Sequence, residues 1–90
     1  MTSRDWYQAG VRQYQMKQYE QALDAFENAY LLHPDPVLLF DIAQSNRRLG
    51  RLDEALSAYK GYLKQLPPGH PRRSTVEKLI EETRRERRRN

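Results

Sequence analysis

The sequence contains few residues whose types and spacing suit catalysis. His33 and His70 each lie beside a proline in an expected loop, and neither has a carboxylate or nucleophile spaced to share a helical face with it. Adjacent carboxylates such as Glu81 and Glu82 point about 100° apart in a helix, so they indicate a solvated surface rather than an acid–base pair. We therefore predict no catalytic residue and expect that the protein is not an enzyme.

Cofactor and metal chemistry are not predicted either. The chain has no cysteine, which excludes disulfides, thiolate zinc sites and thiol catalysis. It also has no glycine-rich phosphate loop and no cluster with metal-ligand spacing. We predict no bound cofactor and no metal, so the function classes that remain are binding functions.

The net charge of +4 comes from the last segment of the chain. Residues 1–71 carry eight basic and eight acidic residues, whereas residues 72–90 carry eight basic and four acidic ones. Clustered arginines contact phosphate independently of sequence, and the basic tail consists of Arg84, Arg85, Arg87, Arg88 and Arg89. Binding of nucleic acid or an anionic surface is therefore an alternative hypothesis. Interleaved glutamates favour a solvated, paired helix end and make nucleic acid the less favoured partner.

The elements that position these residues are expected to be helices. Helical periodicity dominates, and no stretch alternates long enough for a strand. Turn residues divide the chain into expected helices over about residues 3–16, 19–32, 37–49, 52–66 and from Pro71 onward. Gly50 suits a left-handed helix C-terminus, and Pro71 suits a first helical position. Beyond Thr83 the sequence offers no apolar side chain, so we expect that end to fray.

Location is only weakly constrained by the sequence. There is no apolar run long enough for a membrane-spanning helix. The segment 1–6 has no apolar stretch after its charge, so no signal peptide is predicted. The compartment stays open, with the cytoplasm slightly favoured.

An internal repeat organises the chain. An offset of 33 residues places Gly10 on Ala43, Ala22 on Ala55, Leu23 on Leu56, Phe26 on Tyr59 and Pro34 on Pro67. Small residues recur where helices must approach, aromatic residues where a gap must be filled, and prolines where a hairpin must stop. Two stacked helix-turn-helix units are therefore predicted.

These residues resemble the tetratricopeptide repeat, whose pattern is W-x2-L-G-x2-Y, then A-x3-F, then P. The first unit supplies Trp6, Gly10, Ala22, Phe26 and Pro34 in the same frame. The resemblance covers residues 4–67, and the stretches PDPVLLFDIAQ and GRLDEAL look like those of bacterial members.

The two units depart from the repeat pattern at several positions. Gln13 and Asn46 stand where an aromatic residue is usual, and Ala9 stands where leucine is usual. Tyr62 occupies the place of the small Ala29, which implies that the last helix packs as a cap rather than as a third repeat.

The resemblance implies an all-α fold, namely a right-handed α-solenoid with five helices in a single domain over residues 1–90. Repeat 1 is expected over residues 3–34, repeat 2 over residues 36–67 and a capping helix over residues 71–88. Because about three repeats are needed for independent stability, we expect a homodimer or one part of a larger protein.

The function implied by the resemblance is a non-catalytic scaffold for protein–protein interaction. Such modules bind a peptide or helix of a partner in a groove lined by the first helix of each hairpin. The predicted groove residues are Tyr7, Val11, Tyr14, Phe40, Gln44, Arg47 and Arg48. An equally weighted interpretation is that Tyr7 and Tyr14 only cover the edge of the core.

One ligand class known for the family is not predicted. Members that hold a C-terminal carboxylate use paired Lys and Asn residues, and the matching places here hold Tyr7, Val11 and Asp41. An acidic peptide reaching Arg47 and Arg48 is a less favoured alternative to a solvated helix end.

Overall fold

The computed structural model describes residues 1–89, and these residues form five helices joined by short turns. The helices are α1 (Ser3–Gln15), α2 (Tyr19–Leu32), α3 (Val37–Arg48), α4 (Leu52–Gln65) and α5 (Arg72–Arg89). The all-α prediction with five helices is confirmed. Apart from the C-terminal end of α5, each observed boundary lies within one residue of the expected one.

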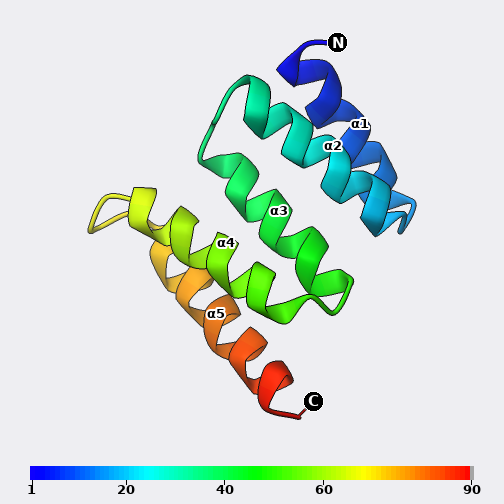
Figure 1. Cartoon of the computed structure of the whole chain (residues 1–90). Helices are drawn as coiled ribbons and strands as arrows, with labels where there is room; N and C mark the ends of the chain where they lie inside the picture. The colour runs from blue at the N-terminus through cyan, green and yellow to red at the C-terminus, as the bar shows by residue number, and fades with distance from the viewer. Residues whose placement is uncertain (90) are drawn as a thin grey trace.

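Each helix packs against the next helix along the chain (Figure 1). The helices α1 and α2 form a first hairpin, α3 and α4 form a second, and α5 lies along α4. The array measures 37 × 32 × 18 Å, so it is thin in one direction. A thin array leaves one side of α1 and α3 without a covering layer.

The start of α1 is held by hydrogen bonds to its own first turn and to α2. The backbone N–H of Asp5 donates to Thr2 Oγ1 at 3.2 Å, and the backbone N–H of Thr2 donates to Asp5 Oδ2 at 3.0 Å. This capping box satisfies two helix N-terminal donors. Ser3 Oγ also donates to the carbonyl oxygen of Ala29 at 2.9 Å, which ties the first turn of α1 to the end of α2.

In the first hairpin, the small residue expected where the helices approach lies against an aromatic ring. Gly10 is buried, and a Cβ atom added to it would lie only 2.7 Å from Phe26 Cε1. The lack of a side chain at Gly10 is therefore what allows α1 to approach α2. In the second hairpin Ala43 and Tyr59 take these places, and both are fully buried in one cluster.

The core continues from the second hairpin into α5. Val76 and Ile80 belong to the same buried cluster as Tyr59 and Tyr62. Arg73 Nη1 donates to the carbonyl oxygens of Leu63 and Leu66, both at 3.1 Å, and so caps the end of α4. The α4–α5 contact thus combines apolar burial with satisfied carbonyl groups.

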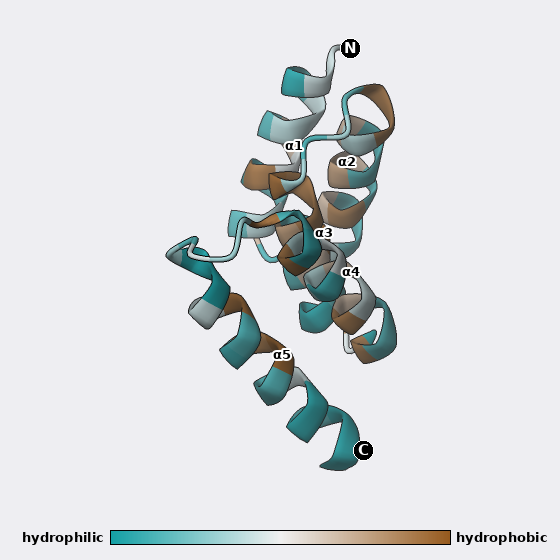
Figure 2. Ribbon diagram, turned by 90° about the vertical axis from the view of Figure 1, so that its left-hand side faces the viewer, coloured by the Kyte–Doolittle hydropathy of each residue, from teal (hydrophilic) through white to brown (hydrophobic). Residues whose placement is uncertain are grey.

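The prediction that the chain frays after Thr83 is wrong, because α5 continues to Arg89. This last part of α5 is strongly hydrophilic (Figure 2), and ion pairs rather than apolar contacts connect it to the rest of the molecule. Glu86 accepts hydrogen bonds from Arg47 of α3, and Arg87 Nε lies 2.8 Å from Asp53 Oδ1 of α4. The sequence-based expectation considered only apolar burial and therefore missed these contacts.

Candidate functional site

A cleft of about 280 Å³ lies between α1 and α3. We call it the α1–α3 cleft, and its lining consists of Val11, Tyr14, Gln15, Phe26, Phe40, Asp41 and Gln44. Four of the predicted groove residues, Val11, Tyr14, Phe40 and Gln44, are therefore brought together. The walls are largely apolar, with polar groups contributed by Tyr14, Gln15, Asp41 and Gln44.

The aromatic rings of the α1–α3 cleft are fixed from behind by the core. The Phe40 ring lies 6.1 Å from that of Tyr59 and 5.7 Å from that of Tyr62, measured between centroids. The Tyr14 ring packs edge-on against Tyr19 at 5.1 Å. Because these rings are already held in place, a ligand that binds to them loses little free energy to the ordering of side chains.

One carboxylate, that of Asp41, lies in the lining of this cleft. Burial raises the pKa of Asp41 from the ordinary 3.8 to about 6, although Arg72 nearby acts in the opposite direction. Loss of hydration disfavours the charged form of a carboxylate, which is why burial dominates. Asp41 is thus the one ionisable carboxylate among the cleft residues that the structure describes.

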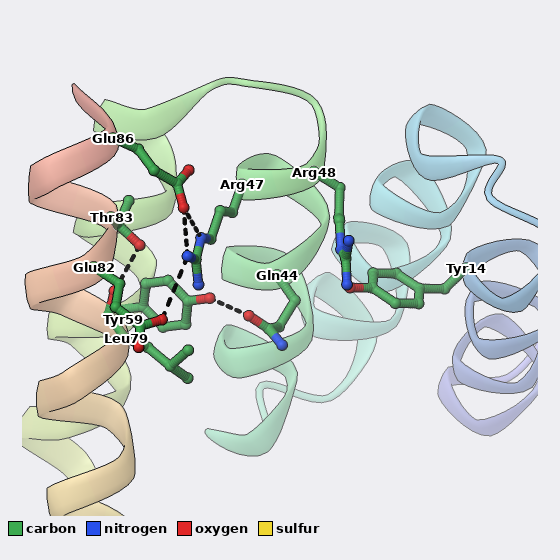
Figure 3. A network of polar contacts seen from close by, with 9 residues as sticks. All are labelled: Tyr14, Gln44, Arg47, Arg48, Tyr59, Leu79, Glu82, Thr83 and Glu86. Carbon is green, nitrogen blue, oxygen red and sulfur yellow. Dashed lines mark hydrogen bonds and ion pairs between the residues drawn. The ribbon is translucent and has the colours of Figure 1, made fainter. Parts of the chain in front are cut away.

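A second depression lies between α3 and α5, and we call it the α3–α5 recess. It is lined by Gln44, Arg47, Arg48, Leu79 and Glu86. Figure 3 shows Arg47 turned toward α5, where its Nε donates to Glu86 Oε1 at 2.9 Å and its Nη2 lies 3.5 Å from Glu82 Oε1. The hydrogen bond from Arg47 to Glu86 raises the pKa of the guanidinium further above its already high value. Arg47 is therefore a charged residue neutralised by its own chain.

A buried hydroxyl continues this polar network beneath the groove. Tyr59 Oη donates to Gln44 Oε1, and burial raises the pKa of the Tyr59 hydroxyl (Figure 3). On α5, Thr83 Oγ1 donates to the carbonyl oxygen of Leu79 at 2.6 Å. Gln44 is consequently held by α4 while it lines both the cleft and the recess.

Arg48 points away from its neighbour Arg47 and toward α1 (Figure 3). Its Nε donates to Tyr14 Oη at 3.2 Å, and its guanidinium carbon lies 5.9 Å from the centre of the Tyr19 ring. The two adjacent arginines therefore connect α3 to different helices.

Tyr7 is not brought together with the other predicted groove residues. Its ring lies 6.0 Å from that of Phe26, but it lines a separate depression at the start of α1, together with Val37 and His33. The spacing of Tyr7, Val11 and Tyr14 places them on one side of α1, and the cleft includes only the last two.

Several lining residues were missed from the sequence. Phe26 belongs to α2 and reaches the cleft past Gly10, a route that only the glycine could have indicated. Leu79 and Glu86 were assigned to a capping helix. However, α5 follows the second hairpin as α3 follows the first, and both residues line the α3–α5 recess. Asp41 was considered only as evidence against a carboxylate clamp.

Most of the basic tail is paired with acidic residues. Arg84, Arg85 and Arg88 each approach Glu81 within 3.5–4.0 Å, and Arg87 approaches Asp53. These pairs are solvent-exposed and individually weak, and three of them share the single carboxylate of Glu81, so they balance only part of the local positive charge. Arg89 has no ion pair among the residues that the structure describes.

Metal binding and membrane insertion find no structural support within residues 1–89. No group of three or more His, Asp or Glu side chains there is arranged to hold a metal ion. No helix of that range combines the length and hydrophobicity needed to cross a bilayer.

Helices that pack consecutively as antiparallel pairs, with a common side formed by α1 and α3, define an all-helical repeat protein. Residues 38–68 match the family model described as tetratricopeptide repeat. The second hairpin is thus similar in sequence to a tetratricopeptide repeat, and the five-helix array fits a tetratricopeptide-like fold. No curated protein and no solved structure matches the chain.

Proposed function

We propose that this protein is a non-catalytic interaction scaffold that receives a segment of a partner protein in the α1–α3 cleft. A protein–protein interaction role at this general level accords with the tetratricopeptide match over residues 38–68. In this proposal residues 3–34 and 36–67 act as two repeats and residues 71–88 as a cap.

The observation that carries the proposal is the apolar character of the α1–α3 cleft. Val11, Tyr14 and Phe40 form its walls without being covered by another helix of the described chain. Apolar surface that stays in contact with water costs about 25 cal/mol per Å², which a docked segment would recover. Aromatic side chains are also the residues most enriched where partners are anchored.

Photocrosslinking from a cleft position tests the proposal. A photoreactive phenylalanine analogue replaces Gln15, an exposed residue that lines the cleft, in the protein expressed in its own host. The matched control carries the analogue at Gln21, an exposed glutamine of α2 outside the cleft. A protein adduct that forms from position 15 and not from position 21 is expected.

Two results would overturn this assignment of the surface. One is an adduct that forms equally from both positions, and the other is an adduct from position 21 alone. Either would place the contact outside the α1–α3 cleft.

Self-association is a second candidate, favoured by exposed apolar residues at the end of α2. Leu31 is 80% and Leu32 is 57% exposed, and the last turn of α2 is strongly hydrophobic (Figure 2). We expect sedimentation velocity to show a concentration-dependent dimer that a double Leu31→Ser, Leu32→Ser variant abolishes. Met16→Ser, which removes an exposed apolar residue elsewhere, is the control. A wild-type protein that stays monomeric at every concentration would rule this candidate out.

The alternative through the basic tail is less supported, because Arg84, Arg85, Arg87 and Arg88 all have acidic neighbours. Retention on heparin and its loss with salt measure this alternative directly. Indifference to heparin of the full chain and of residues 1–71 alike would exclude it.

A further inference from the structure

We propose that the α1–α3 cleft selects a partner segment that inserts a lysine or arginine side chain beside an apolar residue, with the cationic group facing Asp41. This inference rests on the proposed function and specifies the chemistry of the partner. It concerns the same cleft and assigns Asp41 as its specificity-determining residue.

The size and lining of the cleft set the kind of ligand group that fits. Its volume of about 280 Å³ is below the range of about 300–1,000 Å³ typical of small-molecule sites, so it suits one or two side chains. Its walls are the rings of Tyr14 and Phe40 and the side chain of Val11, while Asp41 and Gln44 supply polar groups from α3. A long aliphatic stem ending in a polar head matches this division.

The charge of the cleft argues for a cation. Asp41 has no ion pair within 4 Å among residues 1–89. On α3, Arg47 is paired with Glu86, whereas Arg48 donates only to the neutral Tyr14 hydroxyl and keeps its charge. On α5, Arg72 is near enough to lower the pKa of Asp41, but it donates to Tyr62 Oη at 3.4 Å and forms no ion pair with the carboxylate. Asp41 is therefore the charged side chain of the cleft lining, and it has no direct ion-pair partner among residues 1–89.

Ligand groups of other classes would destabilise the Asp41 carboxylate further. An acidic side chain would meet a half-buried carboxylate and would find Arg47 already neutralised by Glu86 and Glu82. A purely apolar side chain would remove more water from Asp41 without providing a hydrogen bond, which costs free energy. A guanidinium or ammonium group offsets that cost, and it also gains from the neighbouring aromatic faces.

Selection from a displayed library of short random peptides tests the inference on the full chain. Three proteins are used in parallel, namely the wild type, Asp41→Asn and Asp24→Asn. Asp24 is an exposed carboxylate of α2 that does not line the cleft, so its variant is matched in charge. Peptides with Lys or Arg next to an apolar residue are expected to be enriched on the wild type and on Asp24→Asn. This enrichment should disappear on Asp41→Asn.

Affinities of one selected peptide make the result quantitative. Asp41→Asn should weaken binding about tenfold or more, as expected for a hydrogen bond between charged groups. Replacing the basic residue of the peptide with norleucine should have a similar effect on the wild type and little effect on Asp41→Asn. Circular dichroism confirms that each variant is folded, and amide chemical shifts of Val11 and Phe40 report occupancy of the cleft.

The two proposals fail in distinguishable ways. Peptides that shift Val11 and Phe40 but show no preference for a basic residue would overturn the inference and leave the proposed function intact. The same holds if Asp41→Asn selects the same peptides as the wild type. If no peptide is enriched, or if the enriched peptides leave both residues unshifted, both proposals are wrong.

Discussion

The two hairpins have the same architecture but differ in how well their residues satisfy it. Residues 38–68, which match the tetratricopeptide repeat, fall in the second hairpin, and the α1–α2 hairpin lies outside that match. Both hairpins nevertheless pack in the same way, through α1 with α2 and α3 with α4. Both hairpins thus keep a small residue and a large aromatic residue at corresponding places, although only the second falls within the match.

Positions related by the 33-residue offset locate the difference. Asn46 Nδ2 donates to the carbonyl oxygen of Ile42 at 3.1 Å, whereas the Oε1 atom of Gln13 is buried without a hydrogen-bond partner among residues 1–89. After the first helix of each hairpin, φ is positive at Gly50 (77°) and at Lys17 (61°). The second hairpin thus has a suitable residue at each of these two positions, Asn46 and Gly50. In the first hairpin, Gln13 and Lys17 each cost stability. Four predictions test this comparison.

The largest effect is expected at the contact that brings the helices of the first hairpin together. Gly10→Ala places a Cβ atom about 2.7 Å from the Phe26 ring, so ring or backbone must shift. We expect a loss of about 1–3 kcal/mol in the free energy of unfolding, measured by urea denaturation. The counterpart Ala43→Gly should lose only about 0.5–1 kcal/mol, mainly through helix entropy.

A double variant distinguishes overpacking from a general effect on α1. Phe26→Leu shortens the side chain that Gly10 faces, so its combination with Gly10→Ala should cost less than the sum of the two single changes. Strict additivity would show that the contact with Phe26 is not the cause.

The unsatisfied amide of the first hairpin should give the second effect, with opposite sign. Gln13→Leu removes a buried oxygen that has no partner among residues 1–89, so we expect a gain of about 1–2 kcal/mol. The matching change, Asn46→Leu, removes a satisfied donor and should bring no gain. Thermal and urea unfolding of both variants measure the contrast, and equal effects at the two positions would contradict it.

The same comparison shows what the sequence could and could not predict. Helix bounds and the role of Gly50 followed from periodicity and residue type, because these are local properties. The continuation of α5 through residues 84–89 could not be predicted in this way, because it depends on contacts with Arg47 and Asp53, which are distant in sequence.

The candidate site was predicted only in part for a related reason. Spacing places Val11 and Tyr14 on one side of α1, but it does not show which neighbouring groups close a cleft. Phe26 enters from α2, and Asp41 becomes unusual only when packing removes its water. Arg47 and Arg48 were both placed toward a partner, whereas each meets a side chain of another helix.

At Asp41 we expect the free energy of unfolding to depend on pH, by an amount similar to or smaller than the effect at Gln13. The counterpart of Asp41 in the first hairpin is the exposed Gln8. Because burial raises the pKa of Asp41 from 3.8 to about 6, the folded state binds this proton more tightly than the unfolded state. The free energy of unfolding should therefore fall as the pH rises from about 4 to about 6, and the penalty then stays constant. Allowing for partial exposure, it amounts to about 1–2 kcal/mol.

The difference between wild type and Asp41→Asn isolates this effect from other titrating groups. Urea denaturation across that pH range should show the variant gaining relative to the wild type as the pH rises. Gln8→Asp, which adds a carboxylate at the exposed counterpart, should show no comparable trend. A wild-type–Asp41→Asn difference that does not change with pH would contradict the burial of Asp41.

The smallest effect is expected at the turns, where the two hairpins differ in the residue with positive φ. A residue with a Cβ atom pays a steric cost in the left-handed region, and glycine does not, although glycine loses more entropy on folding. Lys17→Gly should therefore raise the free energy of unfolding by about 0.5–1 kcal/mol. The reciprocal Gly50→Lys should lower it by a similar amount, since no atom lies within 4 Å of the added Cβ and only the backbone conformation is affected. Urea denaturation of the two variants measures the pair, and a loss of stability in Lys17→Gly would show that the first turn is not the strained counterpart of the second.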